Sequence, residues 1–200
     1  LADGDVYIFN DPWDGGTHLS DFRLVRPLYR EGRVFCWLAS VGHWHDVGGA
    51  VPGNYNPAAT EAFQEGFVCP PVKLFRAGQY QPDIQAMLEA NSRLPVSLYG
   101  DLNAQINALD LGHARLAALL DEYGDAVVEA AMTALRDRAE RLMRQEIAAL
   151  PDGVYEAVDY MDNDGVVDEA LELRLKLVVQ GDEMTLDFTG SAPACLGPIN

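Results

Sequence analysis

The chain has 200 residues, of which 48% are hydrophobic and 22% charged, a composition typical of one or two globular domains with a core of their own. A formal net charge of −17 argues against a nucleic-acid-binding protein, which would usually present a basic surface. No apolar run approaches the roughly 20 residues of a membrane-spanning helix. The three cysteines form no CxxC motif and follow no recognisable leader, which suits a reducing cytoplasm.

The first eighty residues have the pattern of strands joined by long loops. Alternating apolar and polar side chains predict strands at 5–10, 22–28 and 34–41, and a glycine-containing hairpin turn links the last two. Residues 46–80 keep no sustained period and are rich in glycine, proline and asparagine. We therefore expect a long irregular excursion there, with a single helical turn at 60–65. Loops of this length are usually functional or interfacial.

The middle of the chain is helical. Apolar residues at helical spacing predict a short helix at 83–91 and longer helices at 101–122 and 125–149. Gly124 separates the two long helices, so we expect them to form an αα-hairpin.

Beyond residue 150 the alternation of a β region returns. It predicts an antiparallel meander with strands at 154–161, 166–179 and 184–188. Asp162–Gly165 superficially suggests a calcium loop, but the acidic ligands at its ends are missing, so a turn is the better interpretation. The predicted fold is α+β, with a mixed or antiparallel β region, long loops, a helical hairpin and a meander. Its three segments are residues 1–80, 81–150 and 151–200.

Three of the four histidines are the best indication of chemistry. His18 precedes Asp21 by three residues, and the cluster that runs from His43 through His45 to Asp46 follows about 25 residues later. Two imidazoles and a carboxylate can cover one face of an octahedral ion and leave sites for water or substrate. The spacing matches no strict zinc or calcium pattern, so hydrogen-bonded loop histidines are an equally good interpretation of the pattern. The pattern also leaves the choice between His43 and His45 open.

The sequence contains no nucleotide-binding motif that we recognise. Neither GxxxxGK[ST] nor a strand-linked GxGxxG occurs, so we expect no phosphate-binding loop in this chain.

Several motifs occur in collinear order along the chain. They are GDVYIFNDP (4–12), GGTHLSD (15–21), HWHDVGG (43–49), TEAFQEG (60–66), PPVKLF (70–75), NSR (91–93), GDL (100–102) and DFTGSAPACLGP (187–198). With these motifs the chain resembles the hydantoinase B/oxoprolinase family, which includes B subunits of ATP-dependent N-methylhydantoinases, a portion of 5-oxoprolinases and alpha subunits of acetone carboxylases. Members of the family are longer at both ends, so we expect this chain to be a fragment of a larger subunit.

The resemblance implies a metal site. In acetone-carboxylase-like members the corresponding motifs supply a manganese site, which by motif falls on His18, Asp21 and His43. The donor set favours Mn²⁺, with Zn²⁺ or Fe²⁺ as alternatives. His45 departs from the commonest family pattern, so the second histidine stays open. Asp46 is a candidate to orient a ligating imidazole.

The resemblance also implies a reaction and a partner. Glu61 and Glu65 are weaker candidates for acid/base catalysis or packing, with a structural role favoured, and Glu65 is the one retained as a catalytic candidate. The favoured function is hydrolysis of a small cyclic amide such as a hydantoin or 5-oxoproline, with ATP held by an A-type partner subunit of actin-like ATPase fold in a hetero-oligomer. The alternatives are the alpha subunit of an ATP-dependent ketone carboxylase and a non-catalytic scaffold segment.

The aromatic residues of the first hundred positions predict an interface. Irregular backbone carries Trp13, Trp44, Tyr55, Phe63, Phe67 and Phe75. A lone domain of this size should not expose a large apolar loop surface to water. We therefore expect residues 46–80 to be covered by a partner protein, by another copy or by further parts of the same polypeptide. The alternative is that the loop folds back on its own domain, because ordered loops can pack by their own side chains.

Overall fold

The computed structural model describes residues 1–199, which fold into two compact units, Leu1–Ala118 and a second that begins at Leu119. The α+β fold class predicted from the sequence is confirmed. Among residues 1–199, no helix combines the length and the apolar character that crossing a membrane requires. The predicted segments 1–80, 81–150 and 151–200 follow the order of the elements along the chain. That each segment is a separate domain stays a prediction.

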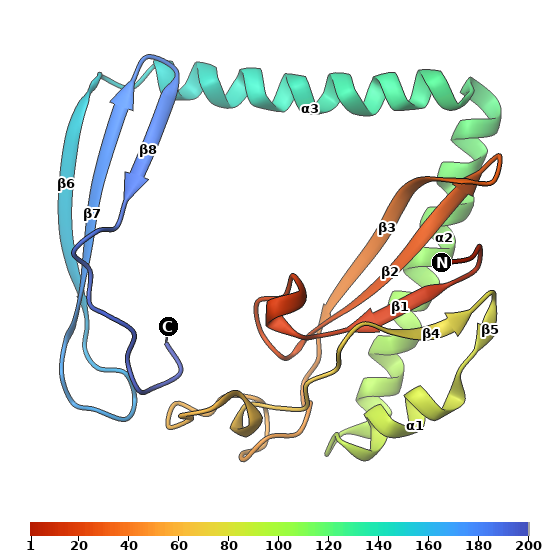
Figure 1. Cartoon of the computed structure of the whole chain (residues 1–200), viewed down its shortest axis with the longest axis horizontal. Coiled ribbons are helices and arrows are strands. Elements are labelled where there is room, and N and C mark those ends of the chain that lie inside the picture. Colours follow the sequence, from red (N-terminus) through yellow and green to blue (C-terminus); the bar gives the residue numbers. More distant parts are fainter. Residues whose placement is uncertain (200) are drawn as a thin grey trace. The chain divides into compact units, whose positions relative to one another are not determined.

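The first unit is built on a five-stranded antiparallel sheet with the strand order β3-β2-β1-β4-β5 (Figure 1). The strands are β1 (Val6–Phe9), β2 (Asp21–Arg30), β3 (Arg33–His43), β4 (Val72–Arg76) and β5 (Gln79–Tyr80). The three predicted strands are confirmed, and β2 and β3 are longer than expected. β4 and β5 were not predicted: they are short, and β4 pairs with β1, whose Tyr7 lies opposite Lys73 far along the chain.

The β2–β3 hairpin has two features that set its register. Its turn contains Glu31 and Gly32, both with positive φ (49° and 77°), as the tight hairpin turns that match strand twist require. Further along, the register shifts between Leu28 and Tyr29, which lie opposite Cys36 and Val34. Such a shift is a β-bulge, with one extra residue on β3.

The remaining elements of the first unit are helical. Two short 3-10 helices are η1 (Pro12–Asp14) and η2 (Ala62–Gln64), and the second is the predicted helical turn. α1 spans Pro82–Ala90, and α2 spans Pro95–Tyr123. α2 begins at Pro95, ahead of the predicted start at residue 101, because proline is well accommodated in the first turn of a helix.

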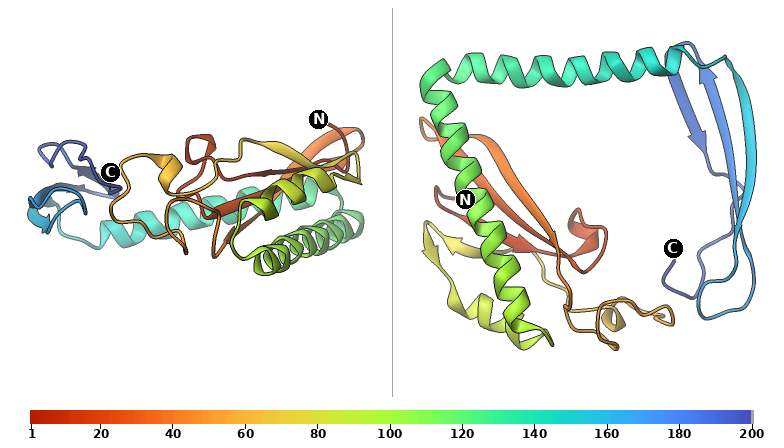
Figure 2. Two further views of the ribbon diagram at one scale, coloured as in Figure 1. Left: turned by 90° about the horizontal axis from the view of Figure 1, so that it is seen from below. Right: turned by 180° about the vertical axis from the view of Figure 1, so that it is seen from behind.

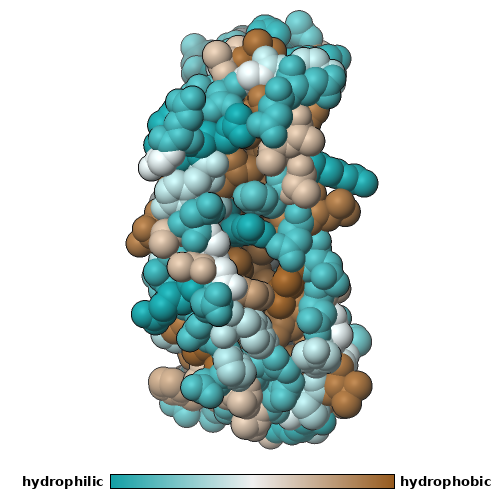
Figure 3. All heavy atoms as spheres, turned by 90° about the vertical axis from the view of Figure 1, so that its right-hand side faces the viewer, coloured by the Kyte–Doolittle hydropathy of each residue, from teal (hydrophilic) through white to brown (hydrophobic). Residues whose placement is uncertain are grey.

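α2 covers one face of the sheet (Figures 1 and 2). Leu102 and Leu109 of α2 belong to the same buried cluster as Ile8 and Leu24 of the strands. The main core therefore lies between α2 and the sheet. On the outside of the molecule, the face drawn in Figure 3 shows apolar side chains in patches between hydrophilic ones.

Trp44, which follows β3, is anchored in this core. It is 1% exposed and stacks on Phe22 with ring centroids 4.0 Å apart. Its indole Nε1 donates to Gln105 Oε1 (2.9 Å), and Gln105 Nε2 donates to the carbonyl oxygen of Phe22 (2.9 Å). The expectation that Trp44 contributes to an exposed aromatic surface is therefore wrong, whereas Tyr55 is exposed.

The second unit contains α3 (Asp125–Ala148) and a three-stranded antiparallel sheet of β6 (Gly153–Met161), β7 (Leu171–Gln180) and β8 (Glu183–Asp187). The predicted meander is confirmed. Gly124, with φ 84°, separates α3 from α2. The packing of these helices as an αα-hairpin stays a prediction.

Residues 162–170 form a loop where the sequence predicted the start of the second strand of the meander. The Asp164 carboxylate accepts hydrogen bonds from the backbone amides of Val166, Val167, Leu196 and Gly197. These bonds hold the pKa of Asp164 at about 2, well below its usual value. The turn at Asp162–Gly165 is thus closed by amides of the protein itself.

Candidate metal centre

Three of the predicted site residues meet at one end of the β2–β3 hairpin. Asp21 is the first residue of β2, and His43, the last residue of β3, lies directly opposite it. His18 is brought beside them by a tight turn, in which the Asp21 amide donates to the His18 carbonyl oxygen (3.0 Å). The His18 amide in turn donates to Asp21 Oδ2 (3.2 Å). Strand pairing and a local turn therefore converge on the Asp21 carboxylate.

The side chains of this triad form a compact donor set. His43 Nδ1 lies 2.7 Å from Asp21 Oδ1, and His18 Nδ1 lies 3.3 Å from Asp21 Oδ2. The two imidazole rings are 5.9 Å apart between centroids and nearly perpendicular. One ligand atom from each residue lies within 4.8 Å of the others. Two imidazoles and one carboxylate fit a divalent ion such as Mn²⁺, Fe²⁺ or Zn²⁺.

The triad combines an ionised carboxylate with accessible imidazoles. Burial raises the pKa of Asp21, but hydrogen bonds from the His43 ring and the His18 amide outweigh it and hold that pKa below its usual value. The His18 and His43 side chains are 68% and 50% exposed, whereas that of Asp21 is 16% exposed. The site can thus present negative charge to an ion that enters from solvent.

A pocket of about 90 Å³ adjoins the triad. It is lined by His18, Leu19, Ser20, His43, Asn54, Tyr55 and Glu65. Glu65, a predicted acid/base candidate, is therefore in the same pocket as the two histidines. Asn54 and Tyr55 were missed as site residues, because only the folding of the irregular excursion brings them to the histidines.

The other predicted site residues lie elsewhere. The Asp46 side chain is buried and binds Arg93 and backbone amides, and within residues 1–199 no hydrogen bond or ion pair joins it to the triad. His45 Nδ1 lies 3.2 Å from Ser97 Oγ, which favours His43 over His45 as the second histidine. Glu61 is exposed at the start of η2 and is not among the residues that line the pocket.

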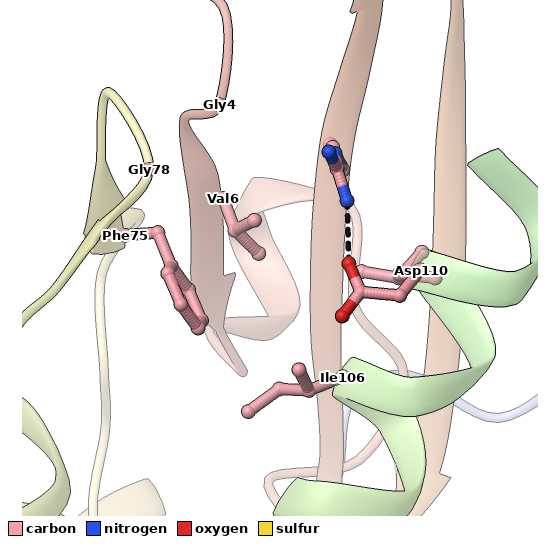
Figure 4. A pocket seen from close by; sticks show the side chains of 8 residues that line it. Gly4, Val6, Phe75, Gly78, Ile106 and Asp110 are labelled. Carbon is pink, nitrogen blue, oxygen red and sulfur yellow. Dashed lines mark hydrogen bonds and ion pairs between the residues drawn. The ribbon is translucent and has the colours of Figure 1, made fainter. Parts of the chain in front are cut away.

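A larger cavity, of about 170 Å³, lies away from the triad between the sheet and α2 (Figure 4). Val6, Phe75 and Ile106 form its apolar wall, and Arg26 Nη1 pairs with Asp110 Oδ1 across 2.6 Å. It contains none of the imidazole or carboxylate groups of the triad. The smaller pocket is therefore the one that adjoins the candidate metal ligands.

Comparison with known proteins identifies the family of this chain. The family model for hydantoinase B/oxoprolinase matches residues 1–200. The chain belongs to the hydantoinase B/oxoprolinase family. The resemblance found in its sequence motifs is confirmed.

Individual members of the family match nearly all of this chain, and the match covers about a third of their own length. The beta subunit of the caprolactamase of Pseudomonas jessenii is 38% identical over 183 residues, which are 92% of this chain and 32% of that protein. The crystal structure of ATP-dependent caprolactamase from the same bacterium matches with a TM-score of 0.85 and 37% identity over 93% of this chain and 32% of that one. The B subunit of a putative D-/L-hydantoinase from a Pseudomonas species is 30% identical, over 98% of this chain and 34% of that protein.

The fold extends to a more distant member. A nucleotide-free acetone carboxylase structure matches with a TM-score of 0.85 at 20% identity, over 96% of this chain and 27% of that one, a likeness of fold. The chain spans about a third of the length of these relatives. It is therefore a segment of a hydantoinase B/oxoprolinase-family subunit.

Proposed function

We propose that this chain is the metal-bearing part of the catalytic subunit of an ATP-dependent cyclic-amide hydrolase. The observation that carries the proposal is the convergence of His18, Asp21 and His43 beside a pocket that the two histidines line. Support for the substrate class comes from relatives named caprolactamase and hydantoinase, since caprolactam and hydantoins are both cyclic amides.

The residues in and around the pocket have different proposed roles in metal binding, proton transfer and loop order. His18, Asp21 and His43 would hold a divalent ion, with Mn²⁺ favoured by the mixed imidazole and carboxylate donors. Such an ion, with open coordination sites, polarises a carbonyl and lowers the pKa of water. Glu65 lines the same pocket and would accept or donate a proton at its carboxylate. Asp46 contributes indirectly, through the loop that it orders beside the pocket.

ATP belongs to a partner in this proposal. The sequence carries neither of the phosphate-binding loops that mark the common nucleotide sites. The relatives are named as parts of larger enzymes, as the beta subunit in the caprolactamase and the B subunit in the hydantoinase. We infer a cytoplasmic hetero-oligomer in which an A-type partner holds ATP and the protein that contains this chain holds the small-molecule substrate.

The second candidate is the alpha subunit of an ATP-dependent ketone carboxylase. It is kept because the acetone carboxylase structure shares this fold, and because the same metal site would serve a carbonyl substrate in either reaction. The two functions differ in the co-substrate, which is water in one and bicarbonate in the other.

The decisive experiment is metal analysis of the full-length subunit, purified with its A-type partner. We expect His18→Ala and His43→Ala to lose the metal, because each removes one of three protein ligands. His45→Ala and His113→Ala should keep it and serve as matched controls, since neither side chain belongs to the triad. A full complement of metal in His18→Ala contradicts the assignment.

The same preparations separate the candidate reactions. ATP turnover stimulated by caprolactam, hydantoin or 5-oxoproline supports the hydrolase, and turnover that needs a ketone with bicarbonate supports the carboxylase. Metal-free protein with neither activity would support the scaffold alternative.

A further inference from the structure

One wall of the pocket beside the triad is formed by a loop with an unusual anchor. Residues 46–55, here called the site loop, begin directly after His45 and end at Tyr55, which lines the pocket. The anchor is Arg93, from the short link between α1 and α2. Arg93 lies in the NSR motif that carries part of the family resemblance.

Arg93 binds the site loop at five points. Its backbone amide donates to Asp46 Oδ1 (3.0 Å), and its Nη1 donates to Asp46 Oδ2 (3.0 Å). Nη1 also donates to the carbonyl oxygens of Gly48 (3.2 Å) and Val51 (3.3 Å), and Nη2 donates to that of Gly49 (2.7 Å). Only a planar, multi-donor guanidinium can serve these acceptors together, and a lysine ammonium lacks that geometry.

At Gly49, the site loop packs closely against the backbone of Gln64 and Glu65. A Cβ atom added to Gly49 would lie 2.7 Å from the Gln64 carbonyl oxygen and 2.8 Å from the Glu65 carbonyl carbon. On its other side, a Cβ on Gly48 would lie 2.9 Å from the Asn91 carbonyl oxygen. The loop is therefore held between the Arg93 link and the segment that carries Glu65, with no room for added atoms at either contact.

The far end of the site loop is closed by Asn54. Its Oδ1 accepts from the Val47 amide (2.9 Å), and its Nδ2 donates to the Trp44 carbonyl oxygen (2.9 Å). Asn54 adopts a positive φ of 63°, a conformation that asparagine tolerates better than most residues. Tyr55 follows directly, so its position depends on the same closure.

We propose that Arg93 is a positioning residue that holds the substrate wall of the pocket, Tyr55 and Glu65, against the metal-binding triad by ordering the site loop through Asp46. The inference rests on the proposed function and adds the residue that shapes its substrate pocket. Within residues 1–199, no hydrogen bond or ion pair joins Arg93 to His18, Asp21 or His43, so metal binding and wall placement are separable.

The test compares Arg93→Ala and Arg93→Lys with wild type in the full-length complex. Arg76→Ala is the matched control, because Arg76 is exposed at the end of β4 and lies outside the pocket. We expect both Arg93 variants to keep the metal and to raise KM for the cyclic amide by about 10-fold, with a smaller fall in kcat because Glu65, the acid/base candidate, moves with the same wall. Hydrogen exchange in residues 46–55 should quicken in both variants. Added guanidinium ion should partly restore KM in Arg93→Ala alone.

A double-mutant cycle separates positioning from general support of the fold. Tyr55→Ala should raise KM by itself, and Arg93→Ala should add little to Tyr55→Ala if both act on the same wall. Effects that multiply would overturn the inference, as would Arg93 variants with the KM of Arg76→Ala. Loss of metal from the Arg93 variants would also overturn it. A wild-type complex without metal or cyclic-amide turnover would instead refute the proposed function, and the inference would fall with it.

Discussion

Replacing Asp46 by asparagine should loosen the site loop while keeping the size of the side chain. The carboxylate is buried and accepts from the amides of Gly48 (3.1 Å) and Arg93 (3.0 Å) at Oδ1. At Oδ2 it accepts from the Gly53 amide (3.3 Å) and the Arg93 guanidinium (3.0 Å). An asparagine has one acceptor oxygen, so in either orientation its NH₂ group faces two donors. Burial raises the pKa of Asp46, but the donors favour the charged form, outweigh the burial and hold that pKa below its usual value.

The size of the effect follows from the two donors left without an acceptor. A buried donor without a partner costs about 1–3 kcal/mol, and a hydrogen bond to a charged group contributes about 1.5–3 kcal/mol. The Arg93 side chain is 41% exposed, so water would re-solvate its guanidinium and reduce the cost. A net loss of about 3 kcal/mol would speed hydrogen exchange of the loop by roughly 100-fold.

Hydrogen exchange of the full-length complex measures this change directly. Peptides that cover residues 46–55 should exchange faster in Asp46→Asn, whereas peptides from β2 should be unchanged. Asp137→Asn, an exposed substitution on α3, is the control for loss of a carboxylate charge. Unchanged exchange of residues 46–55 in Asp46→Asn would refute the reasoning, because the four hydrogen bonds would then contribute nothing to the order of the loop.

Two further predictions concern the substitution of Gly49 and the contribution of Asp5 to stability at acid pH. Gly49→Ala should destabilise the protein by about 1–3 kcal/mol more than Gly53→Ala by urea unfolding, since both have positive φ but only Gly49 would meet backbone atoms within 4 Å. Equal destabilisation would show that the contact with Glu65 is not tight. Burial raises the pKa of Asp5, but Lys73 and the amides of Ala77 and Ala2 outweigh it and lower that pKa from 3.8 to about 2. The stability that Asp5 contributes should thus be complete above pH 4 and lost as the pH falls towards 2. Asp5→Asn should lack this part of the acid dependence in urea midpoints measured across that range.

The sequence predicted those parts of the fold and site that depend on local patterns. Strands β2 and β3, their turn at Gly32 and the break at Gly124 follow from alternation, helical spacing and backbone preference, which are local properties. Clustered histidines beside Asp21 predicted a metal centre, and the structure brings three of those residues together. The pattern alone left the choice between His43 and His45 open, the set His18, Asp21 and His43 came from the family resemblance, and its role in metal binding stays a prediction.

The parts that were missed depend on contacts between distant segments. β4 forms because β1 offers it a pairing edge, not because its own five residues have a strong strand pattern. Asp46 was expected beside the metal because it follows His45, but Arg93, far along the chain, binds it in another direction. The burial of Trp44 likewise depends on Gln105 of α2. No sequence period records such pairings, so they remain invisible until the chain is folded.

The opposition of Asp21 and His43 shows how a small irregularity can decide a site. Counting back from the turn, Arg30 lies opposite Arg33 and Tyr29 opposite Val34, and this register would place Gly42 opposite Asp21. The bulge leaves Phe35 without a partner and moves every later pair by one residue, so that His43 meets Asp21 instead. Because successive side chains of a strand point to opposite faces, a register without the bulge would also turn His43 away from the carboxylate. The bulge thus helps to bring His43 to Asp21 in the candidate metal centre although it lies near the opposite end of the hairpin, and a motif search that reads only the histidines and aspartates has no means to find it.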